Sequence, residues 1–182
     1  VGRGRRVDGA GGVRDWWTDG DAEGYQQRTL RLVAQMNAYE PLPGLHVNGA
    51  LTSAESMGDL GGLTIAFRAY KLSLKGKRSP VIDGLTGEQR FFIGWALAFR
   101  NVSREEQAIQ RLTVDPHSPP EFRVNVVRNI DAFPDAFETK PGGDLWPDPA
   151  ERGPSREPGR PPRSGAALAP APAHQHVAPP PP

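Results

Sequence analysis

The sequence predicts a mainly α-helical fold, and three observations carry this prediction. Thr86-Gly87-Glu88-Gln89 matches a helix capping box, and aromatic side chains follow it at helical spacing. Between residues 21 and 37, apolar side chains also recur at helical intervals. Across the chain, no window alternates apolar and polar residues with the period of two that a half-buried strand requires.

The first predicted helix covers residues 21–37. Thr18 or Asp19 can cap its start, because a short oxygen-bearing side chain accepts a hydrogen bond from a backbone N–H that has no partner within the helix. The segment Pro41-Leu42-Pro43-Gly44 ends it, since proline has no N–H to donate and restricts the residue before it.

The second predicted helix extends from Thr52 to about Leu74 and is dense in apolar side chains. Gly58, Gly61 and Gly62 lower its intrinsic stability by about 1 kcal/mol each relative to alanine. Packing must therefore compensate for this loss. Because glycine lets another backbone or side chain approach closely, the pattern suits a helix pressed against a metal site and a tight helix crossing equally well.

The third predicted helix begins at the capping box of residues 86–89 and carries side chains expected in the core. These side chains are Phe91, Phe92, Trp95, Ala96 and Phe99. A second capping box, Ser103-Arg104-Glu105-Glu106, is expected to open a fourth helix that continues to about Leu112.

Short elements complete the patterned region. Residues 115–120 contain three prolines and break the chain, after which we expect a short helix over residues 122–129 and a turn over residues 131–137. From residue 141 the composition changes, because thirteen of the last 42 residues are proline and large apolar side chains are rare. The sequence thus predicts a helical domain over residues 1–140 and a disordered tail, rich in Pro, Arg and Ala, over residues 141–182.

Charge and composition exclude several classes of function. The chain has 22 basic and 21 acidic side chains, so it offers no field of one sign that would attract nucleic acid or an anionic membrane. It contains no cysteine, which excludes disulfides and thiolate metal sites and leaves carboxylate and imidazole as strong ligands. No apolar run approaches the roughly 20 residues of a membrane span.

Glu55 and Asp59 form the first candidate site, because their spacing places two carboxylates one turn apart on one helix face. An acidic pair of this kind is most often part of a solvated face. A zinc hydrolase offers a second explanation, in which one carboxylate ligates the metal and the other orients a metal-ligating histidine.

The residues around this pair resemble a block of the neprilysin and endothelin-converting-enzyme family of zinc endopeptidases. The matching words are His46-Val47-Asn48-Gly49-Ala50-Leu51-Thr52 and Gly61-Gly62-Leu63, and Asp15-Trp16-Trp17-Thr18 matches farther upstream. The resemblance implies the helical C-terminal subdomain of a zincin-type metalloprotease, with Glu55 as the metal ligand and Asp59 as the side chain that orients a ligating histidine. Ser53-Ala54-Glu55-Ser56 departs from the family's Leu-Gly-Glu-Asn but keeps the glutamate.

His117 and Arg123 belong to a second word that resembles the same family, Asp115-Pro116-His117-Ser118-Pro119-Pro120-Glu121-Phe122-Arg123-Val124-Asn125. The resemblance implies that His117 stabilises the negative charge developing on the scissile carbonyl, a role in which one lost donor typically lowers the rate by about 10²- to 10³-fold. It also implies that Arg123 binds a substrate backbone carbonyl. The alternatives are a surface-loop histidine and a structural ion pair of Arg123 with Glu121 or Asp115.

Ala98 and Phe99 stand where the family often has Val-Trp in its substrate pocket, so the resemblance implies a reshaped pocket that still prefers large apolar side chains. None of the four histidines lies in a His-Glu-x-x-His pattern, and His174-Gln175-His176 in the tail is interpreted as chance composition. A bound zinc would therefore need ligands from outside this chain. We expect the chain to begin after the family's His-Glu-x-x-His helix, to have lost the family's C-terminal end through a frameshift or misassembly, and to be inactive alone.

The expected partners are peptide substrates and the missing N-terminal part of the peptidase. The family's members usually act outside the cytoplasm or at the cell envelope, and this compartment is expected here by analogy alone. A different class of function also remains open, in which the chain is a non-catalytic helical relic or an interaction module whose proline-rich arm docks into aromatic-lined grooves.

Overall fold

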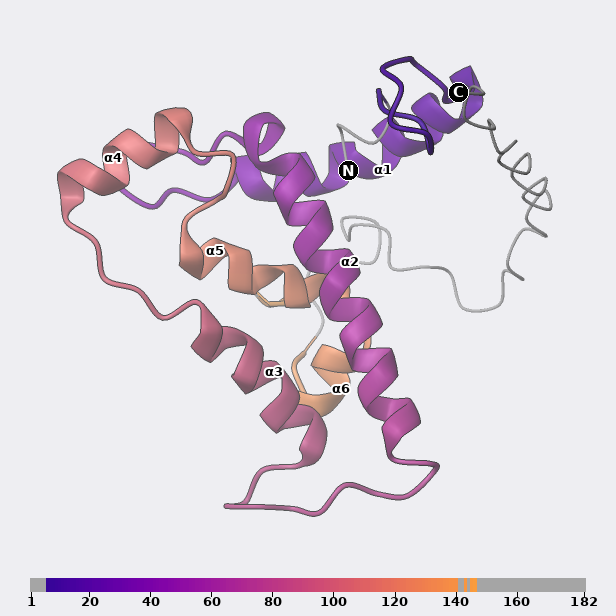
Figure 1. The fold of residues 1–182 in the computed structure, drawn as a ribbon. Coiled ribbons are helices and arrows are strands. Elements are labelled where there is room, and N and C mark those ends of the chain that lie inside the picture. The colour runs from indigo at the N-terminus through magenta and orange to yellow at the C-terminus, as the bar shows by residue number, and fades with distance from the viewer. Residues whose placement is uncertain (1–5, 141–142, 144, 147–182) are drawn as a thin grey trace, which may run out of the picture.

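The computed structural model describes residues 6–140, 143, 145 and 146, and this part of the chain is helical (Figure 1). Its only β pairing consists of isolated bridges in turns, so the described residues form no sheet. The elements in chain order are α1 (Asp19–Asn37), α2 (Gly49–Ser73), α3 (Gly87–Ala98), α4 (Glu105–Val114), α5 (Pro120–Val124), the 3₁₀ helix η1 (Asn125–Asn129) and α6 (Ala132–Phe137).

The long helix α2 is the axis of the fold, because α1 crosses its N-terminal end and η1 packs along it (Figure 1). At the crossing, a Cβ added to Gly49 would lie 2.3 Å from the carbonyl oxygen of Val33, so only glycine fits. The Gly49 N–H donates to the side chain of Asn37 at 2.7 Å. The crossing thereby fixes the start of α2, six residues before Glu55.

Ten buried apolar side chains form one core between α1, α2, α3, η1 and α6. They are Leu32, Met36, Val47, Leu60, Leu63, Phe92, Val126, Val127, Ile130 and Phe133. Inside this core, the Gln35 and Asn129 side-chain amides donate to each other, each at 2.9 Å. This reciprocal pair ties α1 to η1, and it satisfies polar groups whose burial would otherwise be unfavourable.

The helix starts show which local signals determine structure. Thr18 caps α1 in a capping box with Asp21, and Thr86 caps α3 in a capping box with Gln89, so both predicted caps are confirmed, although α1 begins at Asp19 and not at residue 21. The predicted start of α2 at Thr52 is three residues too late, because Asn48 caps the helix by accepting from Leu51 N–H at 3.0 Å.

Three predictions for the second half of the chain need correction. The capping box predicted at Ser103 is wrong, because α4 begins at Glu105 after Arg104, which makes no side-chain cap hydrogen bond, and the helix ends at Val114 rather than Leu112. The single short helix expected over residues 122–129 is two elements, α5 and η1. The turn expected over residues 131–137 is instead the short helix α6.

The close approach predicted at Gly58, Gly61 and Gly62 does not occur among the described residues. A Cβ added at any of the three would have no neighbouring heavy atom within 4 Å, apart from the local helix backbone that such a test leaves out. All three glycines lie on an exposed face of α2. The described fold therefore gives no steric reason for them.

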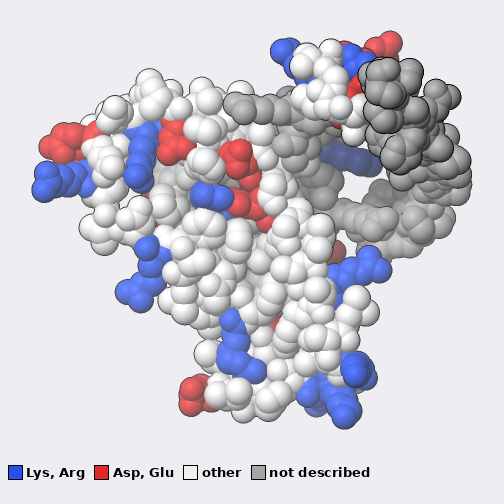
Figure 2. Space-filling model, in the orientation of Figure 1, with Lys and Arg blue, Asp and Glu red and all other residues white. Residues whose placement is uncertain are grey.

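Charged side chains are spread over the surface, with one local excess of basic residues. Figure 2 shows Lys and Arg side chains at the lower end of the molecule, over the connection between α2 and α3, which contains Lys75, Lys77 and Arg78. Within the described part of the chain, no helix is both long and apolar enough to cross a membrane. The proline-rich tail predicted over residues 141–182 lies almost entirely outside the described residues.

Candidate functional site

The structure brings four predicted site residues together from two segments that are distant in the sequence. Glu55 and Asp59 lie one turn apart on α2, His117 lies in the loop before α5, and Arg123 lies on α5. Glu55 contacts His117, and Asp59 contacts Arg123. The site therefore lies where α2 packs against α5 and the loop before it. We call this group of four side chains, Glu55, Asp59, His117 and Arg123, the seam.

The Glu55 carboxylate faces His117, with 3.3 Å between Oε2 and Nε2. Both side chains remain accessible, because Glu55 is 47% and His117 42% exposed. Glu55 is thus neither buried nor directed away from the site. An accessible carboxylate beside an imidazole can receive a cation or a polar substrate group without opening the core.

Asp115 holds His117 from the other side. Its Oδ1 accepts the backbone N–H of His117 at 2.9 Å and lies 2.8 Å from the ring Nδ1. The backbone hydrogen bond is the main reason that the pKa of Asp115 lies below its ordinary value, and the hydrogen bond to the ring adds to the effect. Sequence analysis missed this role of Asp115, although an Asp two residues before a turn residue is a recognisable signal of such a contact.

Asp59 and Arg123 form a two-pronged ion pair, in which Nε donates to Oδ2 at 2.8 Å and Nη2 donates to Oδ1 at 2.7 Å. The pair is largely buried, with 11% of the Asp59 side chain and 24% of the Arg123 side chain exposed. The hydrogen bonds that Arg123 donates to Asp59 raise the pKa of Arg123 above its ordinary value. The sequence analysis offered Glu121 or Asp115 as the partner in a structural ion pair with Arg123. This choice of partner is wrong, because Arg123 pairs with Asp59.

Aromatic side chains support the Arg123 guanidinium from α3. Its Cζ lies 4.7 Å from the centre of the Phe99 ring, within the range of a cation–π contact. Phe99 in turn packs against Trp95, with 4.6 Å between the ring centres. The Trp95 indole N–H donates to the carbonyl of Val124 at 3.3 Å. Phe99 therefore lies against Arg123, and Ala98 beside it is exposed. Their role in a substrate pocket stays a prediction.

The donor set at the seam fits part of a zinc site. Glu55 presents an accessible carboxylate of the kind that zinc accepts. Among the residues that the structure describes, however, no three His, Cys, Asp or Glu side chains are grouped closely enough to hold a metal ion. A zinc ion bound at Glu55 would need further ligands from outside the described residues.

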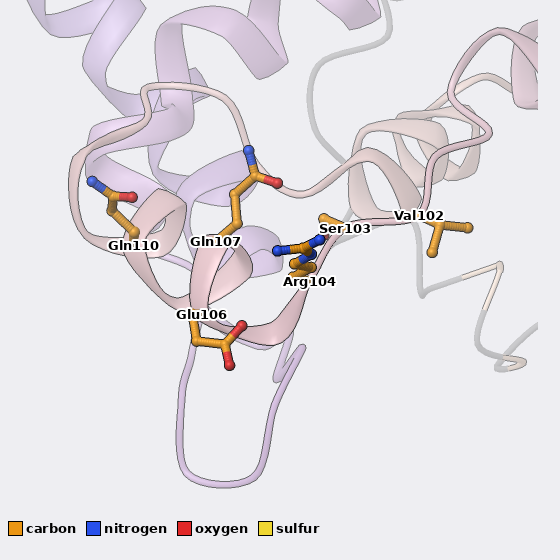
Figure 3. A pocket seen from close by; sticks show the side chains of 6 residues that line it. All are labelled: Val102, Ser103, Arg104, Glu106, Gln107 and Gln110. Carbon is orange, nitrogen blue, oxygen red and sulfur yellow. The ribbon is translucent and has the colours of Figure 1, made fainter.

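A separate hollow of about 600 Å³ lies at the start of α4. Val102, Ser103, Arg104, Glu106, Gln107 and Gln110 line it (Figure 3). None of these residues belongs to the seam. The hollow is shallow and polar, and it has no buried group that would select a ligand.

Comparison with known proteins places the chain in a family. The family model for peptidase family M13 matches residues 1–152. The chain belongs to this family. Among curated M13 relatives, it is 37% identical to neprilysin-1 of Caenorhabditis elegans over 152 residues and 36% identical to human endothelin-converting enzyme 1 over 149 residues.

The M13 chain also matches solved structures. The zinc metalloprotease Zmp1 of Mycobacterium tuberculosis, in complex with an inhibitor, superposes with a TM-score of 0.78 and 53% sequence identity. This match covers 84% of the present chain but 24% of the Zmp1 chain. The two curated relatives are covered to 20% and 19% of their length. The chain thus spans about a fifth of the curated relatives, and its helical fold is that of part of an M13 protein.

Proposed function

We propose that this chain forms one side of the active site of a zinc-dependent, neprilysin-like endopeptidase. The observation that carries the proposal is the geometry of the seam. Oε2 of Glu55 lies 3.3 Å from Nε2 of His117. One turn farther along α2, Asp59 holds the Arg123 side chain of α5. In this assignment Glu55 is one zinc ligand and Asp59 orients a histidine ligand supplied by other polypeptide. A zinc ion bound there would polarise the scissile carbonyl and activate a water molecule.

His117 is placed to stabilise the negative charge that develops on the substrate carbonyl oxygen. Asp115 fixes the ring, because an ionised carboxylate can only accept hydrogen bonds and therefore requires a proton on Nδ1. Nε2 then faces the half-exposed Glu55 carboxylate, 3.3 Å from Oε2. It can donate to an oxyanion when the ring carries both protons, which gives the preorganised electrostatic stabilisation that acyl-transfer chemistry needs.

Arg123 is proposed to position the substrate by donating to a backbone carbonyl. The ion pair with Asp59 uses Nε and one hydrogen of Nη2, and no hydrogen bond from Nη1 occurs within the described part of the chain. The guanidinium thus keeps donors for a peptide while its plane is fixed by Asp59 and Phe99. Phe99 and Ala98 would line the adjoining pocket, and an aromatic wall favours substrates with large apolar side chains at that position.

The missing ligands lead to a further expectation for the chain by itself. With one ligand of the three that a catalytic zinc site requires, the purified chain should bind zinc weakly and hydrolyse no peptide. Titration with zinc followed by metal analysis tests this expectation. Tight one-to-one binding would contradict it and favour a complete site of another kind.

The peptidase assignment itself is tested in a hybrid protein, in which residues 1–152 of this chain replace the matching part of M. tuberculosis Zmp1. Cleavage of a peptide with a large apolar side chain after the scissile bond is expected in this hybrid. Glu55→Gln should abolish cleavage and reduce bound zinc, whereas the matched control Glu105→Gln, on exposed α4, should change neither. A folded hybrid without activity would favour the relic or interaction module instead.

The proposed enzyme acts on peptides and works together with the remaining part of the peptidase domain. By family analogy we infer an extracytoplasmic or cell-envelope location. Fractionation of cells that produce the complete protein, followed by immunodetection with an antibody against this chain, tests the location. Recovery in the cytoplasmic fraction alone would reject it.

A further inference from the structure

The connection between α2 and α3 carries both basic and aliphatic side chains at one end of the molecule (Figure 2). The whole chain is nearly neutral, but residues 60–82 contain five basic side chains and no acidic one. Three of the five lie in the connection, and all three are exposed. Two exposed aliphatic side chains follow within the next four residues. These residues, called the basic loop, are Lys75, Lys77, Arg78, Val81 and Ile82.

The charges of the basic loop are not neutralised within the described part of the chain. Lys71, at the end of α2, forms an ion pair with Glu88 at 2.7 Å, but no ion pair of the described residues involves the three cations of the loop. Residues 74–86 contain a single acidic side chain, Asp83, so this connection has a net charge of +2. The loop therefore offers a local positive field that the overall charge of the chain conceals.

The aliphatic side chains of the loop lead into a tight turn. Ile82 and Leu85 exchange both backbone hydrogen bonds, at 3.1 and 3.0 Å, around Asp83 and Gly84, whose φ angles are 52° and 76°. Positive φ at both central residues defines a type I′ turn, for which Asp-Gly is a favoured pair. The sequence thus gives this part of the loop a defined shape.

Arg90 of α3 anchors the loop on both sides of its aliphatic pair. Its Nη1 donates to the carbonyl of Leu85 at 2.6 Å, and its Nη2 donates to Oγ of Ser79 at 3.2 Å. Between these two anchors, Val81 is 64% and Ile82 48% exposed. A loop that is already ordered loses less conformational entropy on binding than a flexible segment does.

This combination of side chains fits an anionic phospholipid surface. Lipid phosphates attract lysine and arginine, and exposed aliphatic side chains gain free energy when they enter the boundary between headgroups and acyl chains. A polyanion without an apolar layer, such as nucleic acid, would neutralise the charges but leave Val81 and Ile82 in water. The aliphatic pair therefore favours a lipid surface as the partner.

We propose that the basic loop docks the protein onto an anionic phospholipid membrane. Its two aliphatic side chains enter the headgroup region, and its three basic side chains contact lipid phosphates. The loop follows the C-terminal end of α2 at Ser73, whereas Glu55 lies 18 residues earlier, about 27 Å along the helix axis. The loop can thus bind lipid without contacting the seam, and the proposal does not depend on the zinc site.

Vesicle sedimentation with the 182-residue chain tests the docking. Binding is expected to phosphatidylcholine vesicles that contain about one quarter phosphatidylglycerol, and not to vesicles of phosphatidylcholine alone. The double variant Lys77→Gln, Arg78→Gln should lower the partition coefficient at least tenfold. The matched control Arg28→Gln, Arg31→Gln removes the same charge from the exposed side of α1 and should change it less than twofold.

A fluorescent probe tests whether the aliphatic pair enters the lipid. Because the chain has no natural cysteine, Val81→Cys can be labelled with an environment-sensitive dye. Its emission should shift to the blue when anionic vesicles are added. The matched control is Val102→Cys, beyond the far end of α3, where the replaced side chain is 98% exposed and the emission should stay unchanged.

Several outcomes would overturn the proposal. Absence of binding to anionic vesicles, or equal binding to neutral ones, would reject an electrostatic lipid site, and equal losses in the two double variants would show that only net charge matters. Binding without a shift at position 81, together with comparably tight binding to duplex DNA, would identify a general polyanion site. The hybrid with Zmp1 should bind the same vesicles, and failure to do so would show that the loop is covered in a complete peptidase.

Discussion

At the residue scale, the Asp59–Arg123 pair should stabilise the fold as well as the site. Both side chains are largely buried, so removing either partner leaves the other with an unsatisfied charge. We expect Asp59→Asn and Arg123→Met each to lower the free energy of unfolding by about 1 to 3 kcal/mol. In urea unfolding, the double variant should be destabilised by less than the sum of the two single variants. Strictly additive effects would show that the pair contributes no coupling.

Asp115 should make stability depend on acid pH in a defined direction. The pKa of Asp115 is lowered in the folded protein. The hydrogen bonds that its carboxylate accepts from His117 therefore stabilise the fold fully at pH values above the ordinary carboxyl pKa of about 3.9. That contribution is lost as the pH falls through the lower, folded-state pKa. The difference in unfolding free energy between the wild type and Asp115→Asn should therefore be constant near neutral pH and vanish in strong acid.

The cause of this shift can be separated by a second variant. Because the backbone N–H of His117 makes the largest contribution, His117→Ala should keep most of the lowered pKa of Asp115. Carbon-13 NMR titration of the Asp115 carboxyl measures it. A return to the ordinary value in His117→Ala would show that the imidazole, and not the backbone, holds the carboxylate.

At the element scale, two glycines of α2 should respond to alanine in opposite directions. Gly49→Ala places a methyl group 2.3 Å from the Val33 carbonyl oxygen and should destabilise the chain by about 1 to 3 kcal/mol through overpacking. Gly58→Ala meets no neighbour and should stabilise the isolated chain by up to about 1 kcal/mol through helix propensity. Thermal unfolding of both variants checks the signs, and destabilisation by Gly58→Ala would mean that the described residues leave out a contact at this face.

Elements with local signals were predictable from the sequence, and contacts between distant segments were not. The capping boxes at Thr18 and Thr86 depend on residues three positions apart, so the sequence shows them directly. Nothing in the structure explains why Ser103 does not cap α4 in the same way. The pairing of Asp59 with Arg123 joins residues 64 positions apart, and no local pattern specifies it. The family resemblance identified both residues, but the packing of α5 on α2 determined their contact.

At the scale of the whole molecule, the balance of buried and exposed apolar surface predicts marginal stability for the chain alone. Ten apolar side chains are buried in the described part, whereas fourteen large apolar side chains are exposed there. Since burial of apolar surface is the dominant favourable contribution to folding, much of the stabilisation available to this sequence is unused in isolation.

The same balance predicts a large gain in stability when the chain is part of a complete peptidase domain. In the hybrid with Zmp1, residues such as Ile65 and Leu72 should become buried, and each fully buried aliphatic side chain contributes about 1.5 to 3 kcal/mol. Urea unfolding followed by circular dichroism should therefore show a higher midpoint for the hybrid than for the 182-residue chain. Ile65→Ser should lower the midpoint of the hybrid and leave that of the chain nearly unchanged, since Ile65 is already exposed there. Equal effects in both proteins would mean that the exposed apolar side chains of α2 are simply surface residues, and that the fold needs no further polypeptide to complete it.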